Sequence, residues 1–123
     1  MARLMSIAAA ALLAVTGCAP VADGRSFELV EFEVDGPATL PSSTTSLDVT
    51  NSGQFPHTLV VTDIDGSVVA ATYLIQPGET AGLELDLTPG TYSFTCRIVA
   101  QNSEGAIIDH FEAGMHATVS VED

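Results

Sequence analysis

Four residues of types that bind metal ions are His57, Cys96, His110 and Met115. His57 follows the turn-forming segment NSGQFP, and Cys96 ends the strand-like segment GTYSFTC. His110 and Met115 come shortly before another strand-like segment, HATVSV. In an antiparallel pair the start of one strand lies beside the end of its neighbour. We therefore expect His57 and Cys96 to meet at one end of a sheet.

The chemistry of these donors indicates copper. Imidazole is a good copper ligand, thiolate favours Cu(I), and a weakly bound thioether adjusts the reduction potential. Two His, one Cys and one Met form the ligand set of a blue-copper site, which holds one copper ion. A packed β-sandwich suits such a site, because its core holds the ligands still while copper changes oxidation state.

Each of these residues taken singly has a simpler interpretation. A lone Cys at the end of a strand is usually a small buried hydrophobic residue, and a lone His after a turn is usually a surface residue. His116 competes with His110, because it directly follows Met115. A Zn site of one Cys and two His with an open position is a further alternative, although no carboxylate lies at a diagnostic spacing.

Strand signals dominate the elements that must position these residues. Short apolar or alternating segments are separated by turn residues such as DGPA, DIDGS, QPGE and TPG. This spacing predicts an all-β fold, an antiparallel Greek-key β-sandwich or barrel of about seven to eight strands. The interval 97–109 has no clear strand, and we expect a long loop there. The predicted strands cover residues 27–34, 45–50, 57–63, 68–75, 80–87, 90–96 and 116–122.

The chain resembles the cupredoxins, most closely the plastocyanin branch. The resemblance covers roughly residues 27–122, and three segments carry it: NSGQFPHTLVVTD at 51–63, PGTYSFTC at 89–96 and HFEAGMHATVSV at 110–121. The resemblance implies copper bound by His57 Nδ1, Cys96 Sγ and His110 Nδ1, with the Met115 sulfur at a longer distance. It also implies that His116 is not a ligand.

The chain departs from the family pattern between the second and third ligands. Cys96 and His110 are separated by the 13 residues 97–109, and the usual Pro-Gly before the second His is replaced by AIID. Thr58 stands where plastocyanins often have Asn, so we expect its hydroxyl to tie the ligand loops together. These departures bear on the spectroscopic type of the site more than on copper binding.

The N-terminal segment predicts export and lipidation. Residues 1–17 have one Arg, a short apolar run and a small-residue boundary, which is the pattern of a signal peptide. VTGC resembles a bacterial lipobox with Cys18 as the lipidated residue, and an ordinary signal peptide cut nearby is the alternative. Residues 18–26 then form the lipidated Cys and a short tether, and 27–123 form one cupredoxin-like domain. We expect an extracytoplasmic protein anchored to the bacterial cell membrane by its lipid alone.

The charge of the exported part restricts its partners. Residues 18–123 carry two Arg, no Lys, and 16 Asp and Glu, a formal charge of −14. Nucleic-acid binding is excluded in practice, because phosphates need Lys and Arg. Most of the acidic excess is expected to be solvated surface. The negative charge would still steer a redox partner protein that has a basic docking surface. We expect the protein to be a monomer.

The function predicted from these patterns is that of a one-electron carrier without enzymatic activity. Electrons would pass at the His110 edge, inside an apolar patch of Ile107, Ile108, Phe111 and Ala113. The main competing function is that of a copper carrier or scavenger, which uses the same ligands without fast electron transfer. The sequence also allows a metal-free adhesion or assembly module, or a catalytic Zn site.

Overall fold

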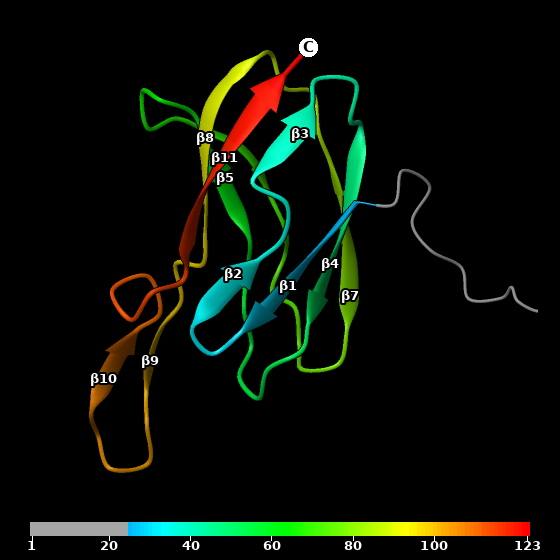
Figure 1. Ribbon diagram of the computed structural model, residues 1–123. Helices are drawn as coiled ribbons and strands as arrows, with labels where there is room; N and C mark the ends of the chain where they lie inside the picture. Colours follow the sequence, from blue (N-terminus) through cyan, green and yellow to red (C-terminus); the bar gives the residue numbers. More distant parts are fainter. Residues whose placement is uncertain (1–24) are drawn as a thin grey trace, which may run out of the picture.

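The computed structural model describes residues 25–123, in which every regular element is a β-strand (Figure 1). The predicted signal peptide, the predicted lipidation site Cys18 and most of the predicted tether lie outside the described residues. In residues 25–123 we find no helix that is long and apolar enough to cross a membrane.

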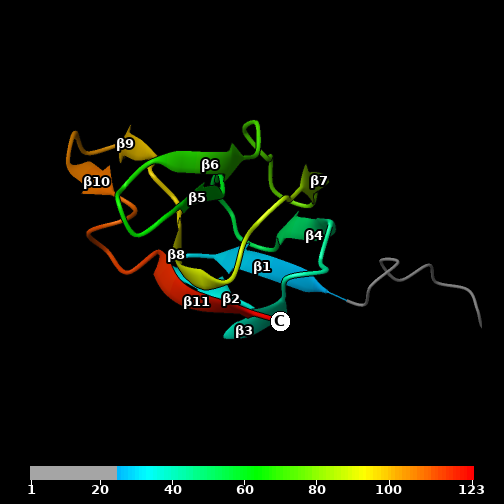
Figure 2. The ribbon, with the colours of Figure 1, turned by 90° about the horizontal axis from the view of Figure 1, so that it is seen from above.

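Nine strands form two sheets that pack face to face (Figures 1 and 2). In spatial order the four-stranded sheet contains β2 (Glu33–Asp35), β1 (Ser26–Val30), β4 (Ser46–Asn51) and β7 (Thr80–Glu84). The five-stranded sheet contains β3 (Thr39–Pro41), β11 (His116–Glu122), β8 (Gly90–Thr95), β5 (Val60–Thr62) and β6 (Val68–Ala71). Two further strands, β9 (Val99–Gln101) and β10 (Ile107–Asp109), form a separate hairpin.

Apolar side chains alternate along the strands and fill the space between the sheets. In β7, for example, Ala81 and Leu83 are buried while their neighbours are exposed. Phe27 of β1 and Phe94 of β8 meet across the interior, with ring centroids 4.9 Å apart. The predicted all-β sandwich is therefore confirmed, although residues 25–123 contain nine strands in the sandwich and two in the hairpin, rather than seven to eight in all.

The predicted strand arrangement differs from the structure in three respects. The expected strand 27–34 is broken after Val30, so β1 and β2 form a hairpin with Glu31 and Phe32 at its turn. No Gly, Pro or Asn marks this turn, and the alternating pattern runs straight through it. The short strand β3 was not predicted. The sandwich is also mixed rather than antiparallel, because β1 pairs with β4, and β11 with β3, in parallel.

The expected long loop 97–109 is instead the β9–β10 hairpin, which projects from the sandwich (Figures 1 and 2). The Asn102 side chain accepts hydrogen bonds from the amides of Glu104 and Ala106, at 2.9 Å each. Gly105 has a φ of 86°, which a residue with a side chain rarely adopts. Turn residues were thus present in the sequence, but the flanking strands of three residues were too short to predict.

Candidate metal centre

Strand pairing brings the predicted ligands to one end of the five-stranded sheet. Thr95, the last residue of β8, pairs with Val60 at the start of β5 and with His116 at the start of β11. Cys96 therefore lies beside the residues that precede both neighbours, His57 and Met115. The sequence-based expectation that antiparallel neighbours would bring His57 and Cys96 together is borne out.

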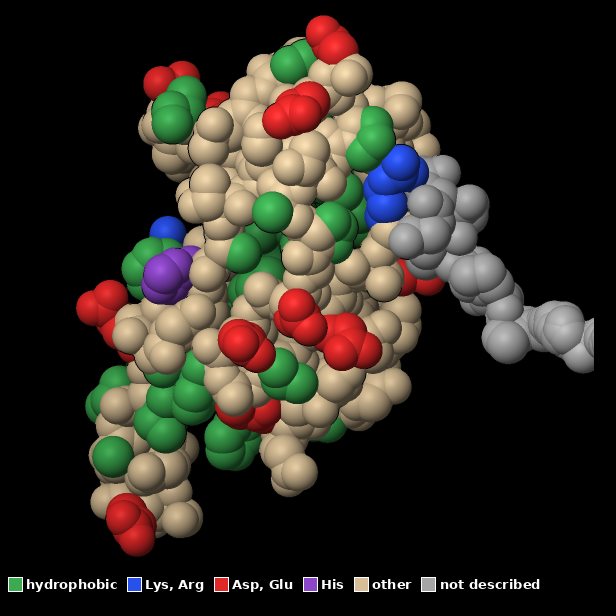
Figure 3. Space-filling model, viewed as in Figure 1, with side chains coloured by type: hydrophobic (Ala, Val, Ile, Leu, Met, Phe, Trp, Pro, Cys, Tyr) green, Lys and Arg blue, Asp and Glu red, His purple; other side chains and the backbone are tan. Residues whose placement is uncertain are grey.

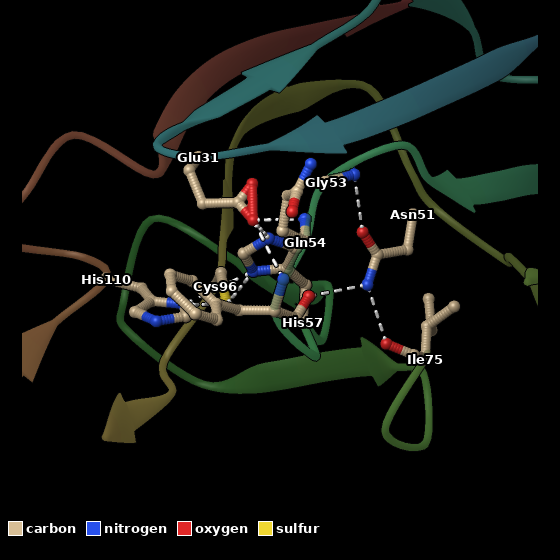
Figure 4. A network of polar contacts seen from close by, with 9 residues as sticks. Glu31, Asn51, Gly53, Gln54, His57, Ile75, Cys96 and His110 are labelled. Carbon is tan, nitrogen blue, oxygen red and sulfur yellow. Dashed lines mark hydrogen bonds and ion pairs between the residues drawn. The ribbon is translucent and has the colours of Figure 1, made fainter. Parts of the chain in front are cut away.

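The donor atoms of His57, Cys96 and His110 lie within 4.8 Å of one another, and all three side chains are buried. Cys96 Sγ is 3.8 Å from His57 Nδ1 and 3.6 Å from His110 Nδ1, and the two nitrogens are 3.2 Å apart (Figure 4). Both imidazoles thus present Nδ1, the nitrogen that the family resemblance implied. The described part of the chain contains no other such group of His, Cys, Asp and Glu.

This arrangement fits a mononuclear metal ion. N and S donors bind at about 2.0–2.3 Å, so donors around one ion stand roughly 3.2–3.9 Å apart. The three observed separations fall in this range. Two imidazoles and a thiolate match the trigonal donor set of copper electron-transfer sites.

Met115 is fully buried and is held beside the other three residues by its backbone. Its carbonyl accepts a hydrogen bond from the Cys96 amide, and its amide donates to the His110 carbonyl, at 3.0 Å each. The turn before it contains Gly114, which has a φ of 126°; a Cβ there would lie 3.0 Å from the Phe32 carbonyl oxygen. The structure thus places Met115 in the core next to the cluster.

His57 is held by a bridge to Ile75 and by Asn51. The His57 amide donates to the Ile75 carbonyl at 3.0 Å, and the Ile75 amide donates back at 2.8 Å. The buried Asn51 side chain donates to the carbonyls of Phe55 and Ile75, and it accepts from the Gly53 amide, all at 2.8 Å (Figure 4).

Asn51 therefore shapes the loop that delivers His57. The predicted tie through the Thr58 hydroxyl is not found: within residues 25–123 that hydroxyl makes no hydrogen bond of this kind. Sequence reasoning missed Asn51, although it is the first residue of the NSGQFPH motif.

Glu31 is a second residue that sequence reasoning missed. Its Oε1 lies 3.6 Å from His57 Nε2, on the side of the ring away from Cys96. The same oxygen accepts hydrogen bonds from the amides of Gln54 and Phe55. No sequence signal marks Glu31, because its position depends on the unpredicted β1–β2 turn.

The environment shifts the pKa values of these titratable groups. Burial lowers the pKa of His57 below 6.5, against the opposing effect of Glu31, and the nearby His110 lowers it further. Burial also lowers the pKa of His110, although Glu31 and Asp109 oppose it. Burial alone would raise the pKa of Glu31, but the amides of Gln54 and Phe55 and the His57 ring outweigh it and lower that pKa below 4.5. Neutral imidazoles, the form that binds metal, are thus favoured near neutral pH.

The metal-free protein is expected to lose stability as the pH falls below about 6.5. His57 and His110 have lowered pKa values in the folded state, so below 6.5 the unfolded chain binds protons that the folded chain does not. Each His contributes a slope of at most about 1.4 kcal/mol per pH unit until the pH reaches its folded pKa. Urea unfolding between pH 8 and pH 5 measures this slope, and His110→Phe is expected to roughly halve it. A flat profile in the wild type would contradict the prediction.

Aromatic and aliphatic side chains surround His110, whose exposed fraction is only 1%. The Phe32 ring packs edge-on against it at 5.2 Å, and Phe55 lies at 6.4 Å. Beside it is a cavity of about 250 Å³, closed on one side by the β9–β10 hairpin. The residues lining this cavity are Phe55, Pro56, Leu74, Ile98, Ala100, Gln101, Asn102, Ile108 and His110.

The apolar surface around His110 is formed mostly by residues other than the four that were predicted. Of its four expected members only Ile108 lines this cavity, and Ile107 points outward with 66% of its surface exposed. Phe111 instead contacts the Arg97 guanidinium, 4.2 Å from its ring centre, and the ring of His116 at 4.9 Å. His116 is exposed and lies outside the cluster, which agrees with the expectation that His110 is the better candidate.

Comparison with solved structures identifies the fold. An auracyanin from Roseiflexus castenholzii matches with a TM-score of 0.60 at 19% identity, over 80% of this chain and 95% of its own. An azurin from Methylomonas sp. strain J matches with a TM-score of 0.58 at 14% identity, over 80% and 96%. A purple cupredoxin from Nitrosopumilus maritimus matches with a TM-score of 0.53 at 17% identity, over 80% and 99%. No family model and no curated protein matches the sequence. The chain has the cupredoxin fold.

Proposed function

We propose that this chain, a cupredoxin by its fold, binds one copper ion and carries single electrons. The observation that carries the proposal is the convergence of His57 Nδ1, Cys96 Sγ and His110 Nδ1 in a buried cluster. In this proposal these three residues hold the ion, and Met115 is the weak fourth ligand. Copper, when bound, supplies one-electron chemistry.

The protein supplies a rigid and dry environment for that chemistry. His57 is fixed through Ile75 and Asn51, and the Cys96 amide is bonded to Met115. Phe32, Phe55 and the hairpin keep water from His110. A ligand set that cannot rearrange favours electron transfer, because little reorganisation accompanies the change of oxidation state.

The proposal extends to location and partners. The lipobox-like sequence ending at Cys18 supports an extracytoplasmic protein anchored to the membrane by lipid. The proposal takes the domain to be a monomer. Acidic side chains are spread over the face seen in Figure 3, and the charge of −14 of residues 18–123 favours a redox partner with a basic docking surface. Under this proposal the protein transfers electrons and is not itself an enzyme.

Titration with Cu(II) tests the proposal. We expect saturation at one copper per chain, an intense visible absorption band, and a rise in the free energy of unfolding of about 4 kcal/mol when free copper is about 1,000 times the Kd. Optical and EPR spectra and thermal melts measure these effects. Failure to bind Cu(II) or Cu(I), or preferential retention of Zn in the purified protein, would contradict the proposal.

One observation favours copper handling as the second candidate. His110 is almost completely covered, partly by the hairpin, whereas fast electron transfer favours an accessible ligand edge. The rate of electron self-exchange separates the candidates. Slow exchange together with tight Cu(I) binding would favour a copper carrier or scavenger.

A further inference from the structure

Glu31 is a largely buried carboxylate that is held by backbone hydrogen bonds next to His57. Its side chain is only 17% exposed, and it reaches from the β1–β2 turn to the loop between β4 and β5 that carries His57. There Oε1 accepts hydrogen bonds from the Gln54 and Phe55 amides. A Cβ on Gly53 would lie 2.1 Å from Glu31 Oε2, so Gly53 leaves the space that the carboxylate occupies.

The two nitrogens of the His57 ring face different groups. Nδ1 faces Cys96 and His110, whereas Nε2 is buried and has no hydrogen-bond partner within the residues that the structure describes. Glu31 Oε1, at 3.6 Å, is the acidic oxygen that faces Nε2. This separation is slightly too long for a hydrogen bond and too short for a water molecule to lie between the two atoms.

A buried ring N–H without a partner is unfavourable and rare in folded proteins. A movement of a few tenths of an ångström would let Nε2–H donate to the carboxylate. The proton would then stay on Nε2, and the Nδ1 lone pair would point towards Cys96 and His110. A carboxylate behind a metal-binding His fixes the tautomer and makes the ring a stronger donor.

We infer that Glu31 is a positioning residue that holds His57 in the Nε2–H tautomer and places a negative charge behind this ligand. The tautomer part stands on the metal-free geometry, and the effect on copper rests on the proposed function. The negative charge stabilises Cu(II) more than Cu(I), so Glu31 lowers the reduction potential.

The first test uses the metal-free protein. ¹⁵N-NMR of the His rings is expected to show wild-type His57 protonated at Nε2, and Glu31→Met is expected to lose that preference. An Nδ1–H tautomer in the wild type, or an unchanged tautomer in Glu31→Met, would overturn the inference. The wild-type measurement needs no variant, so an Nδ1–H tautomer there overturns the inference even if Glu31→Met fails to fold. Gly53→Ala, which takes the space of the carboxylate and leaves its charge in place, is expected to resemble Glu31→Met.

The second test uses copper and a matched charge control. Glu31→Gln keeps the size and an acceptor oxygen, whereas Glu33→Gln removes the same charge from an exposed position on β2. We expect Glu31→Gln to weaken Cu(II) binding relative to Cu(I) about tenfold, which raises the potential by about 59 mV. Equal potentials in the two variants would overturn the charge effect. If neither wild type nor variant binds copper, the proposed function fails, while the NMR result still decides the role of Glu31.

Discussion

Replacement of Cys96 by Ser is expected to abolish the intense visible absorption of the Cu(II)-loaded protein. The Cys96 sulfur lies 3.6–3.8 Å from both Nδ1 atoms, so it is the donor that the two imidazoles face. A Ser hydroxyl occupies nearly the same volume but does not ionise at neutral pH, and it lacks the soft sulfur that copper prefers. The remaining imidazoles would leave a weak, nearly colourless complex.

The loss of copper affinity should be larger than the roughly 100-fold that outer-shell substitutions reach at most. Absorption spectroscopy and competition with a chelator measure the two effects. Thr95→Ser is the matched control, because Thr95 is the adjacent buried residue and does not belong to the cluster. It should retain both the band and the affinity. An unchanged band in Cys96→Ser would show that copper binds elsewhere.

Replacement of Asn51 by Ala is expected to cost about 3 kcal/mol of the free energy of unfolding, even without metal. The substitution removes three hydrogen bonds of 2.8 Å, and it leaves the carbonyl of Phe55 and the amide of Gly53 without this partner. Domains of this size are stable by only about 5–15 kcal/mol. The loss is therefore a large fraction of the total.

Denaturant unfolding of the metal-free protein measures this loss. Asn102→Ala is the matched control, because the Asn102 side chain also bonds to the backbone, accepting two hydrogen bonds, but is exposed in the β9–β10 turn. It should cost less than about 1 kcal/mol. Equal costs for the two variants would mean that Asn51 is not needed to hold the His57 loop.

The roles of Cys96 and Asn51 were not equally predictable from the sequence. Cys96 ends one predicted strand and His57 begins another, so their meeting followed from antiparallel pairing alone. Asn51 begins the NSGQFPH motif, but nothing in its own neighbourhood reveals that Ile75 is its partner. That contact depends on a bridge between segments that are distant in the sequence.

The type of fold and the donor set were determined by the sequence itself. Alternation of apolar and polar residues has a period of two in strands, and turn residues interrupt it, so the approximate positions of the longer strands are local properties. The types of His57, Cys96, His110 and Met115 limit the possible metals for the same reason: donor chemistry belongs to the side chain and not to its surroundings.

The tertiary structure alone decided what surrounds those donors. The β1–β2 turn has no turn residue to announce it, yet it brings Glu31 to the far side of His57. The hairpin of β9 and β10 covers His110 because its short strands pair with each other and frame a cavity against Phe55 and Leu74. Such contacts form between residues far apart in the chain. Their free energy depends on packing and burial, which no local pattern of residues records.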